Sequence, residues 1–441
     1  MSTQSDALER RTMTRVMLRV VPLLMVCYIV SYLDRVNVGF AALTMNRELG
    51  LSEQMYGLGA GIFFVTYFLF ELPSNLMLHR FGARLWIARI MLSWGIVSGA
   101  MGFIPQIAAL TGLSNVTVFY GLRLLLGAAE AGFFPGVIFY LTLWFPNAYR
   151  ARVVGYFMTA LPLASVIGGP LCGWLLGVGG THGMSGWQWL FVIQAVPAIV
   201  LSVVLLVWLT DQPAKAAWLA DDERRWLTVQ LAREAAALPA DAHASVWRTL
   251  ANPLVIALGL VYFSVVYMNY TVGYFLPQII HAFGLGNFET GCLAALPSAV
   301  GALSMVLWGR RSDRLGERKW HLVFPLAVGA ASFGAVSLMH APLFVVLTFS
   351  FAAFGIYGCQ PVFWTLPGAF LTGGSAAAGI AVINAVANLS GFAGPYLMGW
   401  IKSATGSYTP GLLIASAMAA IATLLVAGVS QRRFPMKTRA A

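Results

Sequence analysis

Long apolar runs alternate with short polar segments along the whole chain of 441 residues. About 20 apolar residues are needed to cross the hydrocarbon core of a membrane, and the sequence supplies twelve runs of that length. The longest polar segment, 211–247, follows the sixth run, and its DDERRWL stretch is typical of a water-facing amphipathic helix. The predicted spans are 18–40, 55–77, 85–104, 116–140, 152–176, 187–209, 252–280, 291–308, 320–339, 342–364, 376–400 and 411–429.

This pattern predicts an all-α membrane protein with twelve transmembrane helices in two six-helix bundles. We expect the bundles over residues 1–209 and 251–441, joined by a linker over residues 210–250 that carries the amphipathic helix. The N-terminus is polar and basic and has no small-residue cleavage site ahead of the first span, so we expect that span to be retained.

The composition and the placement of charges agree with this prediction. Hydrophobic residues make up 59% of the chain and charged residues only 10%, whereas a soluble domain carries about 25% charged residues. The net charge of +11 does not predict a nucleic-acid partner, because the basic residues lie in short loops, where they orient the spans. When alternate loops are assigned to one side, that side receives 23 of the 27 basic residues and both chain ends. We therefore expect both termini in the cytoplasm.

The loops after the second and the eighth spans have related sequences. Residues 75–85 read NLMLHRFGARL and residues 309–319 read GRRSDRLGERK. One such loop in each six-span half is the internal repeat expected of a transporter built from duplicated halves. The aligned pairs are Arg80 with Arg314, Gly82 with Gly316, and Arg84 with Arg318.

These loops resemble the GxxxDRxGxR motif of the major facilitator superfamily, and the resemblance covers nearly the whole chain. The second copy matches in full and includes Gly309 and Asp313. The first copy has Asn75 and His79 in place of the Gly and the Asp, so we expect a weaker charge interaction at the cytoplasmic gate of the first half.

Three further segments narrow the resemblance to the anion:cation symporter family of that superfamily. They are SYLDRVNVGF from residue 31, FELPSN from residue 70 and RLLLGAAEAGFFPG from residue 123. That family includes bacterial permeases for tartrate, sugar acids and aromatic carboxylates. The resemblance implies proton-coupled uptake of a small organic anion by alternating access, without a cofactor, by a monomer in the bacterial inner membrane.

Three acidic residues lie inside the predicted spans: Asp34, Glu71 and Glu130. A charged side chain inside a membrane costs at least about 2.5–3.5 kcal/mol, so such residues are rarely kept without a function. Arg123 and Glu130 are spaced i and i+7 with Gly127 between them, so they share one helix face. Glu130 is either a proton switch that exchanges arginine partners or one member of a static ion pair that fixes helix packing.

The family resemblance assigns roles to these charges. It implies that Glu130 takes the coupling proton and that Arg35 and Arg123 attract the substrate anion. Asp34 and Arg35 are neighbours on a helix and point about 100° apart, so they cannot serve one another. Asp34 then belongs to the proton circuit or contacts another helix, while Arg35 and Tyr32 share a face and can hold a carboxylate. Alternatively, the charged pair anchors the helix end near the outer membrane surface.

Further substrate contacts are predicted around this site. Tyr67 lies one turn before Glu71 and is either a cavity residue or an interfacial aromatic, whereas Glu71 suits a role in the gate. Polar side chains at helical spacing in the second half suggest a cavity wall, from which we predict Tyr274, Trp364 and, by resemblance, Asn384. Leu161 stands where sugar-acid permeases carry a Gln, which favours a smaller or more apolar carboxylate.

Two other classes of protein were weighed. An antiporter that exports amphipathic compounds is suggested by the partial GPxxG pattern over residues 168–173, but buried Arg35 and Arg123 do not suit a hydrophobic cation. A membrane enzyme or sensor lacks support, since the chain has no HExxH, GxSxG or phosphate-binding loop. Histidines and cysteines lack ligand spacing, so we expect no metal site.

Overall fold

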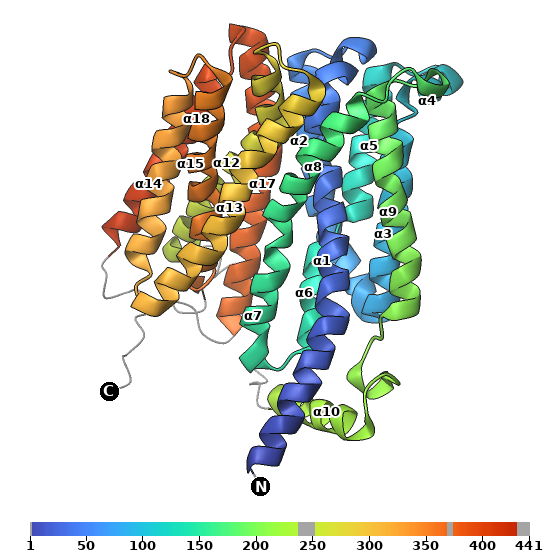
Figure 1. The fold of residues 1–441 in the computed structure, drawn as a ribbon, viewed down its shortest axis with the longest axis vertical. Helices are drawn as coiled ribbons and strands as arrows, with labels where there is room; N and C mark the ends of the chain where they lie inside the picture. Colours follow the sequence, from blue (N-terminus) through green and yellow to red (C-terminus); the bar gives the residue numbers. More distant parts are fainter. Residues whose placement is uncertain (1, 237–251, 368–373, 430–441) are drawn as a thin grey trace.

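The computed structural model describes residues 2–236, 252–367 and 374–429, which form a bundle of long helices (Figure 1). The first half contains α1 (Ser2–Leu49), α2 (Glu53–Phe81), α3 (Ala83–Met101), α4 (Ile104–Thr111), α5 (Asn115–Glu130), α6 (Phe133–Trp144), α7 (Asn147–Met158), α8 (Ala160–Leu176) and α9 (Gly186–Trp208). The second half contains α12 (Pro253–His281), α13 (Asn287–Leu315), α14 (Lys319–Val336), α15 (Pro342–Phe363), α17 (Gly374–Thr405) and α18 (Thr409–Gly428).

Among the described residues, eleven helical segments are long and apolar enough to cross a membrane. The pair α3 and α4, bent by 82°, provides a twelfth. This confirms the predicted all-α fold with twelve spans. Two predicted spans are broken helices, since α5 and α6 together form one span and α7 and α8 another. The basic residues expected in the C-terminal tail, 430–441, and Arg248 of the linker lie outside the described residues.

Local sequence explains where several helices begin and end. The side chain of Ser52 accepts a hydrogen bond from the backbone N–H of Met55 and caps the start of α2. Asn252 caps α12 in the same way, and Pro253 occupies the first helical turn, where no backbone donor is needed. Gly316 ends α13 in the left-handed conformation, which glycine adopts without strain.

The two halves pack most extensively along two pairs of helices, α2 with α17 and α8 with α13 (Figure 1), and α1 also contacts α12 between them. Glycines allow the backbones to touch at both crossings. A side chain at Gly57 of α2 would meet the carbonyl oxygen of Pro395, and one at Gly169 of α8 would meet that of Gly291. These residues belong to the part of each helix that lies away from the N-terminus of α1. We call this side of the molecule the closed end.

The end of α2 that lies away from the closed end is less covered by other helices. Phe68, Leu69, Phe70 and Leu72 are all exposed, and Leu69 and Leu72 are exposed by 60% and 69%. Consecutive helical residues are about 100° apart, so these side chains cover more than half of the helix circumference. Among the described residues, the second half of α2 is therefore more exposed than its first half.

The linker is attached to the first half. Its helix α10 (Asp221–Ala236) follows the short η2 (Pro213–Lys215) and lies beside the start of α1 (Figure 1). Fully buried Glu223 accepts hydrogen bonds from Nε of Arg11 (2.8 Å) and Nη1 of Arg15 (2.7 Å). The guanidinium of Arg19 lies 4.2 Å from the ring of Trp208 on α9 and 4.9 Å from the ring of Trp218 in the linker. These contacts fix α10 to the first bundle.

We predict that Gly57→Leu destabilises the closed end. The new side chain meets the Pro395 carbonyl, which moves only if α17 moves, and overpacking of this kind costs about 1–3 kcal/mol. Gly121→Leu is the matched control, because nothing lies within 4 Å of the position where its side chain begins. The midpoint of thermal unfolding in detergent should fall for Gly57→Leu and stay near the wild-type value for the control. Equal midpoints would contradict this prediction.

Candidate functional site

A buried ion pair joins the first and the fifth helices in the centre of the first half. Nε of Arg35 on α1 donates to Oε1 of Glu130 on α5 at 2.7 Å, and Oγ of Ser31 donates to the same oxygen at 2.8 Å. Arg35 is 8% exposed and Glu130 only 1%. Bonds between ionised partners at these distances are among the strong hydrogen bonds of proteins.

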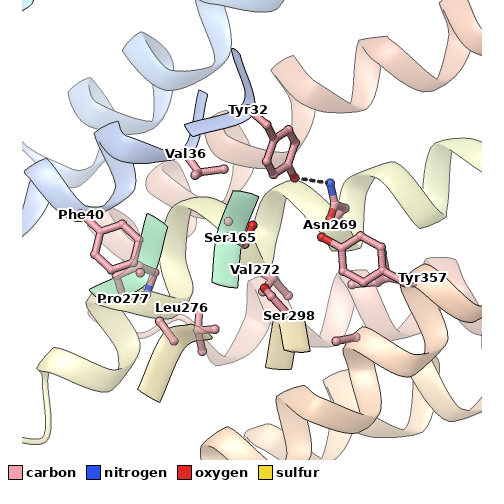
Figure 2. A pocket seen from close by; sticks show the side chains of 15 residues that line it. Tyr32, Val36, Phe40, Ser165, Asn269, Val272, Leu276, Pro277, Ser298 and Tyr357 are labelled. Carbon is pink, nitrogen blue, oxygen red and sulfur yellow. Dashed lines mark hydrogen bonds between the residues drawn. The ribbon is translucent and has the colours of Figure 1, made fainter. Parts of the chain in front are cut away.

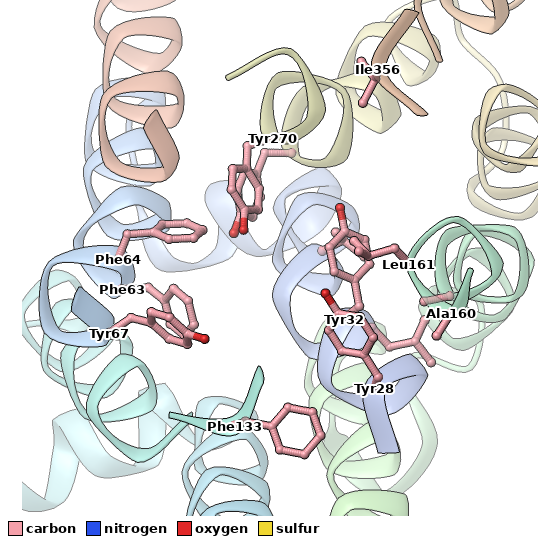
Figure 3. Close-up of a cluster of buried hydrophobic side chains, with 14 of the residues drawn as sticks. Tyr28, Tyr32, Phe63, Phe64, Tyr67, Phe133, Ala160, Leu161, Tyr270 and Ile356 are labelled. Atoms are coloured by element: carbon pink, nitrogen blue, oxygen red, sulfur yellow. The ribbon is translucent and has the colours of Figure 1, made fainter. Parts of the chain in front are cut away.

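Aromatic rings lie close to the guanidinium of Arg35, and Figure 3 shows Phe63, Tyr67 and Tyr270 among them. Its central carbon lies 4.8 Å from the centre of the Tyr67 ring and 5.7 Å from that of Phe63, both on α2, which allows cation–π attraction. Nη1 of Arg35 donates to the hydroxyl of Tyr270 on α12 at 3.4 Å. Because α12 belongs to the second half, Tyr270 connects Arg35 to the other bundle. Of the polar side chains on this helix, only Tyr274 was predicted from the sequence to contact substrate.

Arg123 is fully buried and does not contact Glu130. Its Nε donates to the carbonyl oxygen of Gly59 (3.0 Å) and its Nη2 to that of Ala60 (3.1 Å), both on α2. The shared face of Arg123 and Glu130 on α5 is therefore real, but each side chain has partners on a different helix. Gly127 between them permits the close contact of α5 with α2, because a side chain there would meet the carbonyl of Phe63.

Three atoms on the charged side chains of this site have no hydrogen-bond partner among the described residues. They are Nη2 of Arg35, Nη1 of Arg123 and Oε2 of Glu130, and all three are buried. Leaving a buried polar group unpaired costs about 1–3 kcal/mol, and more when the group is charged. Two free donors on cations and one free oxygen on an acid suit an anion and a proton as ligands.

The helix breaks directly after Glu130. Helix α5 ends there, α6 begins at Phe133, and Gly132 between them has a φ of +85°. Its missing side chain leaves room for Ser74 of α2. Broken membrane helices are a feature of transporter binding sites near the midplane. The AG pair of AEAGFFPG was the available signal for this break, and sequence analysis placed one continuous span across it.

Asp34 points away from Arg35, as the helix geometry predicted. Its carboxylate accepts hydrogen bonds from Nε1 of Trp94 (2.7 Å) and Oγ of Ser98 (3.0 Å), both on α3. Nδ2 of Asn37 is a third donor, at 3.2 Å from Asp34 and 3.0 Å from Oε1 of Gln194 on α9. Asp34 thus connects α1 to its neighbours within the first half, which is the helix-partner alternative of the sequence analysis.

The other predicted substrate contacts lie at different places around the site. The Tyr32 hydroxyl accepts a hydrogen bond from Nδ2 of Asn269 on α12 (2.8 Å). Tyr274 is buried, with its ring stacked 5.8 Å from that of Tyr270. Nε1 of Trp364 donates to the Tyr262 hydroxyl at 3.3 Å, whereas Asn384 on α17 and Glu71 on α2 are half-buried. In the described part of the chain, no polar contact joins Trp364, Asn384 or Glu71 to Arg35.

In the repeated loop of the second half, the arginine is held by hydrogen bonds to residues of the same loop. Nη2 of Arg318 donates to Oδ1 of Asp313 (2.7 Å), and its Nη1 donates to Ser312 (2.9 Å). Gly316 supplies the left-handed turn, and Gly309 lies where a side chain would contact Pro361 at 3.3 Å. Arg314 lies in the last turn of α13.

The loop of the first half obtains its acid from elsewhere in the chain. Oδ1 of Asp211, at the start of the linker, accepts a hydrogen bond from the backbone N–H of Arg84 at 2.8 Å, and its Oδ2 lies 4.0 Å from Nε of Arg84. Gly82 turns the chain with a φ of +88°. Arg80 lies against the ring of Phe81. Asp211 was not predicted from the sequence, because only its position in space relates it to the loop.

Comparison with known proteins identifies the relatives of this chain. It is 47% identical over 437 residues to an Agrobacterium vitis protein named "Putative tartrate transporter", covering 98% of this chain and 95% of that protein. It is 41% identical to the "Quinolone resistance transporter" of Acinetobacter baumannii, with 92% of each chain covered. In fold it is similar to an inward-facing structure of a bacterial homologue of the human lysosomal transporter Spinster. That match has a TM-score of 0.76 and 18% identity, and covers 96% of this chain and 99% of the other.

A family model agrees with these relatives. The model described as Major Facilitator Superfamily matches residues 24–395 and 258–440, which together include nearly all of the predicted spans. The names of the relatives are consistent with the motifs that resemble carboxylate permeases. The chain therefore belongs to the Major Facilitator Superfamily, and it is a multi-pass membrane transporter and not an enzyme.

Proposed function

We propose that this transporter takes up a small organic carboxylate together with protons. The observation that carries the proposal is the Arg35–Glu130 pair, whose Nη2 and Oε2 atoms are buried without partners. A substrate carboxylate would bind Arg35 and compete with Glu130 for it. Once Arg35 is shared, the buried Glu130 is left without its cation, which favours the protonated acid. Anion binding and proton binding then support one another.

The membrane potential supplies a reason for this coupling. Moving one negative charge into a cell at −100 mV costs about 2.3 kcal/mol, and a proton carried with it offsets that cost. Release follows in reverse, because Glu130 loses its proton, pairs with Arg35 again and displaces the anion. The fixed Arg123 adds positive potential beside the same site throughout the cycle.

The assignment of the two sides of the membrane determines which way this structure faces. We place both termini in the cytoplasm of a bacterium, with the protein working as a monomer in the inner membrane. The closed end, where Gly57 lies against Pro395, then faces outward, and the less covered side of α2 faces inward. In this arrangement Tyr67 and Tyr270 contact Arg35 at the binding site, Tyr32 and Tyr274 extend it, and Trp364 and Asn384 provide the wall of the second half.

Export of amphipathic compounds is a second candidate function. The aromatic side chains around Arg35 favour it, as does the Acinetobacter relative named for quinolone resistance (Figure 3). The two buried arginines favour an anion over a hydrophobic cation. Purified protein in liposomes separates the two functions, because an inward proton gradient drives accumulation of a labelled carboxylate by a carboxylate symporter and expulsion of a preloaded amphipathic compound by an antiporter.

Arg35→Ala is predicted to lower the affinity for a labelled carboxylate such as tartrate by at least about tenfold. A charged hydrogen bond contributes about 1.5–3 kcal/mol, and 1.4 kcal/mol corresponds to a factor of ten. Arg47→Ala is the control, because Arg47 is a solvent-exposed arginine at the end of the same helix. Binding to the purified variants in detergent is the measurement. Unchanged affinity in Arg35→Ala would contradict the proposed site.

Glu130→Gln is predicted to keep binding and exchange of substrate but to lose accumulation driven by a proton gradient. The amide mimics the protonated acid and cannot release a proton. The measurement compares counterflow with gradient-driven uptake in the same liposomes. A Glu130→Gln variant that still accumulates substrate against its gradient would exclude Glu130 as the proton carrier.

Asp34→Asn is predicted to lower the unfolding midpoint while proton coupling persists. The amide nitrogen would face Nε1 of Trp94 or the Ser98 and Asn37 donors, and a buried donor without an acceptor costs about 1–3 kcal/mol. Thermal unfolding and the same pair of transport assays provide the measurement. Loss of accumulation with intact exchange would instead assign Asp34 to the proton circuit.

A further inference from the structure

A small cavity lies between the two halves, next to the candidate anion site (Figure 2). Its volume of about 30 Å³ has room for about two water molecules. Helices α1 and α8 of the first half and α12, α13 and α15 of the second half form its walls. The polar residues that line it are Tyr32, Ser165, Asn269, Ser298 and Tyr357.

These polar groups are all uncharged. The bond from Asn269 to the Tyr32 hydroxyl crosses from the second half to the first at one side of the cavity (Figure 2). The Tyr357 hydroxyl is within hydrogen-bonding reach of Tyr32 and Ser165, and Ser298 lines the same space (Figure 2). Hydroxyl and amide groups both donate and accept, so they match a ligand hydroxyl.

The cavity and Arg35 are connected through two neighbouring contacts. Tyr32 and Arg35 are three residues apart on α1, so they share a face and lie about 4.5 Å apart along the helix axis. Asn269 and Tyr270 are adjacent on α12, and each contacts one member of that pair. A carboxylate on Arg35 and a hydroxyl in the cavity would thus contact neighbouring positions on the same two helices, α1 and α12.

We propose that this cavity is a subsite for the hydroxyl groups of a short hydroxycarboxylate whose carboxylate is bound by Arg35. The inference rests on the proposed function and specifies its substrate class. Space for about two water molecules admits one or two hydroxyls. Apolar Leu161, which is buried close to Tyr32 in Figure 3, agrees with this limit.

Residues from both halves surround the subsite, so its occupant also joins them. A ligand hydroxyl bound by Ser165 on α8 and Ser298 on α13 bridges the same two helices that cross at Gly169 and Gly291. Occupancy therefore favours the arrangement in which the closed end is closed. The subsite links recognition of the hydroxyl to the movement of the bundles.

Binding of tartrate, malate and succinate tests this proposal, because these four-carbon acids carry two, one and no hydroxyls at the same charge. One hydrogen bond contributes about 0.5–1.5 kcal/mol, so wild-type affinity should fall about two- to tenfold with each hydroxyl removed. In Ser298→Ala and in Asn269→Leu, the affinities for the three acids should agree to within about twofold, with the succinate affinity unchanged from the wild type. Ser304→Ala is the matched control on α13, since its hydroxyl bonds to Gly301 of its own helix (2.7 Å).

Competition against a labelled acid with purified, folded variants gives the affinities, and the unfolding midpoint checks that each variant is folded. Equal affinities of the wild type for the three acids would overturn the subsite. So would differences in affinity among the acids that stay the same in both variants. Wild-type protein that binds none of the three acids would overturn it as well. Failure of the proposed function gives a different result. In that case Arg35→Ala does not change the affinity, or the proton gradient does not change uptake, regardless of how affinity varies among the three acids.

Discussion

The buried ion pair between Arg35 and Glu130 is the interaction on which the rest of the site depends. Removing one partner of such a pair leaves an uncompensated charge and costs about 3–5 kcal/mol. The surroundings reduce this cost in several ways, through Ser31 on the acid, the Tyr67 ring on the cation and Tyr270 from the second half. The break in the helix after Glu130 lies directly beside the pair, at a glycine that leaves room for Ser74. Charge and backbone irregularity thus coincide at one place.

The contacts within the first half differ in kind from the contacts between the two halves. Within the first half, hydrogen bonds between side chains join the helices, as the contacts of Asp34 and those of α10 with Arg11 and Arg15 show. Between the halves at the closed end, backbone meets backbone across glycines. Contacts of this kind have no side chain that can adapt, so the helices must separate as bodies when that end opens. Polar contacts through Asn269 and Tyr270 cross the same interface nearer the binding site.

Much of the fold was predictable from the sequence, because the lipid core imposes length and polarity on every span. Geometry within one helix was predictable too, and it separated Asp34 from Arg35 and placed Arg123 and Glu130 on one face. Contacts between helices were not predictable in this way. The partner of Glu130 proved to be Arg35, 95 residues away, and Arg123 is bound to backbone carbonyls that carry no sequence signal. Asp211, which replaces the acid missing at His79, was hidden for the same reason.

The ring of Phe63 lies against both arginines, 5.7 Å from the guanidinium carbon of Arg35 and 5.0 Å from that of Arg123. Two like charges repel, yet each is attracted to the same aromatic side chain. One uncharged ring therefore contacts both positive charges. Under the proposed function, an anion that touches both arginines has to fit beside this ring, so the size of an uncharged side chain would bear on the size of the substrate.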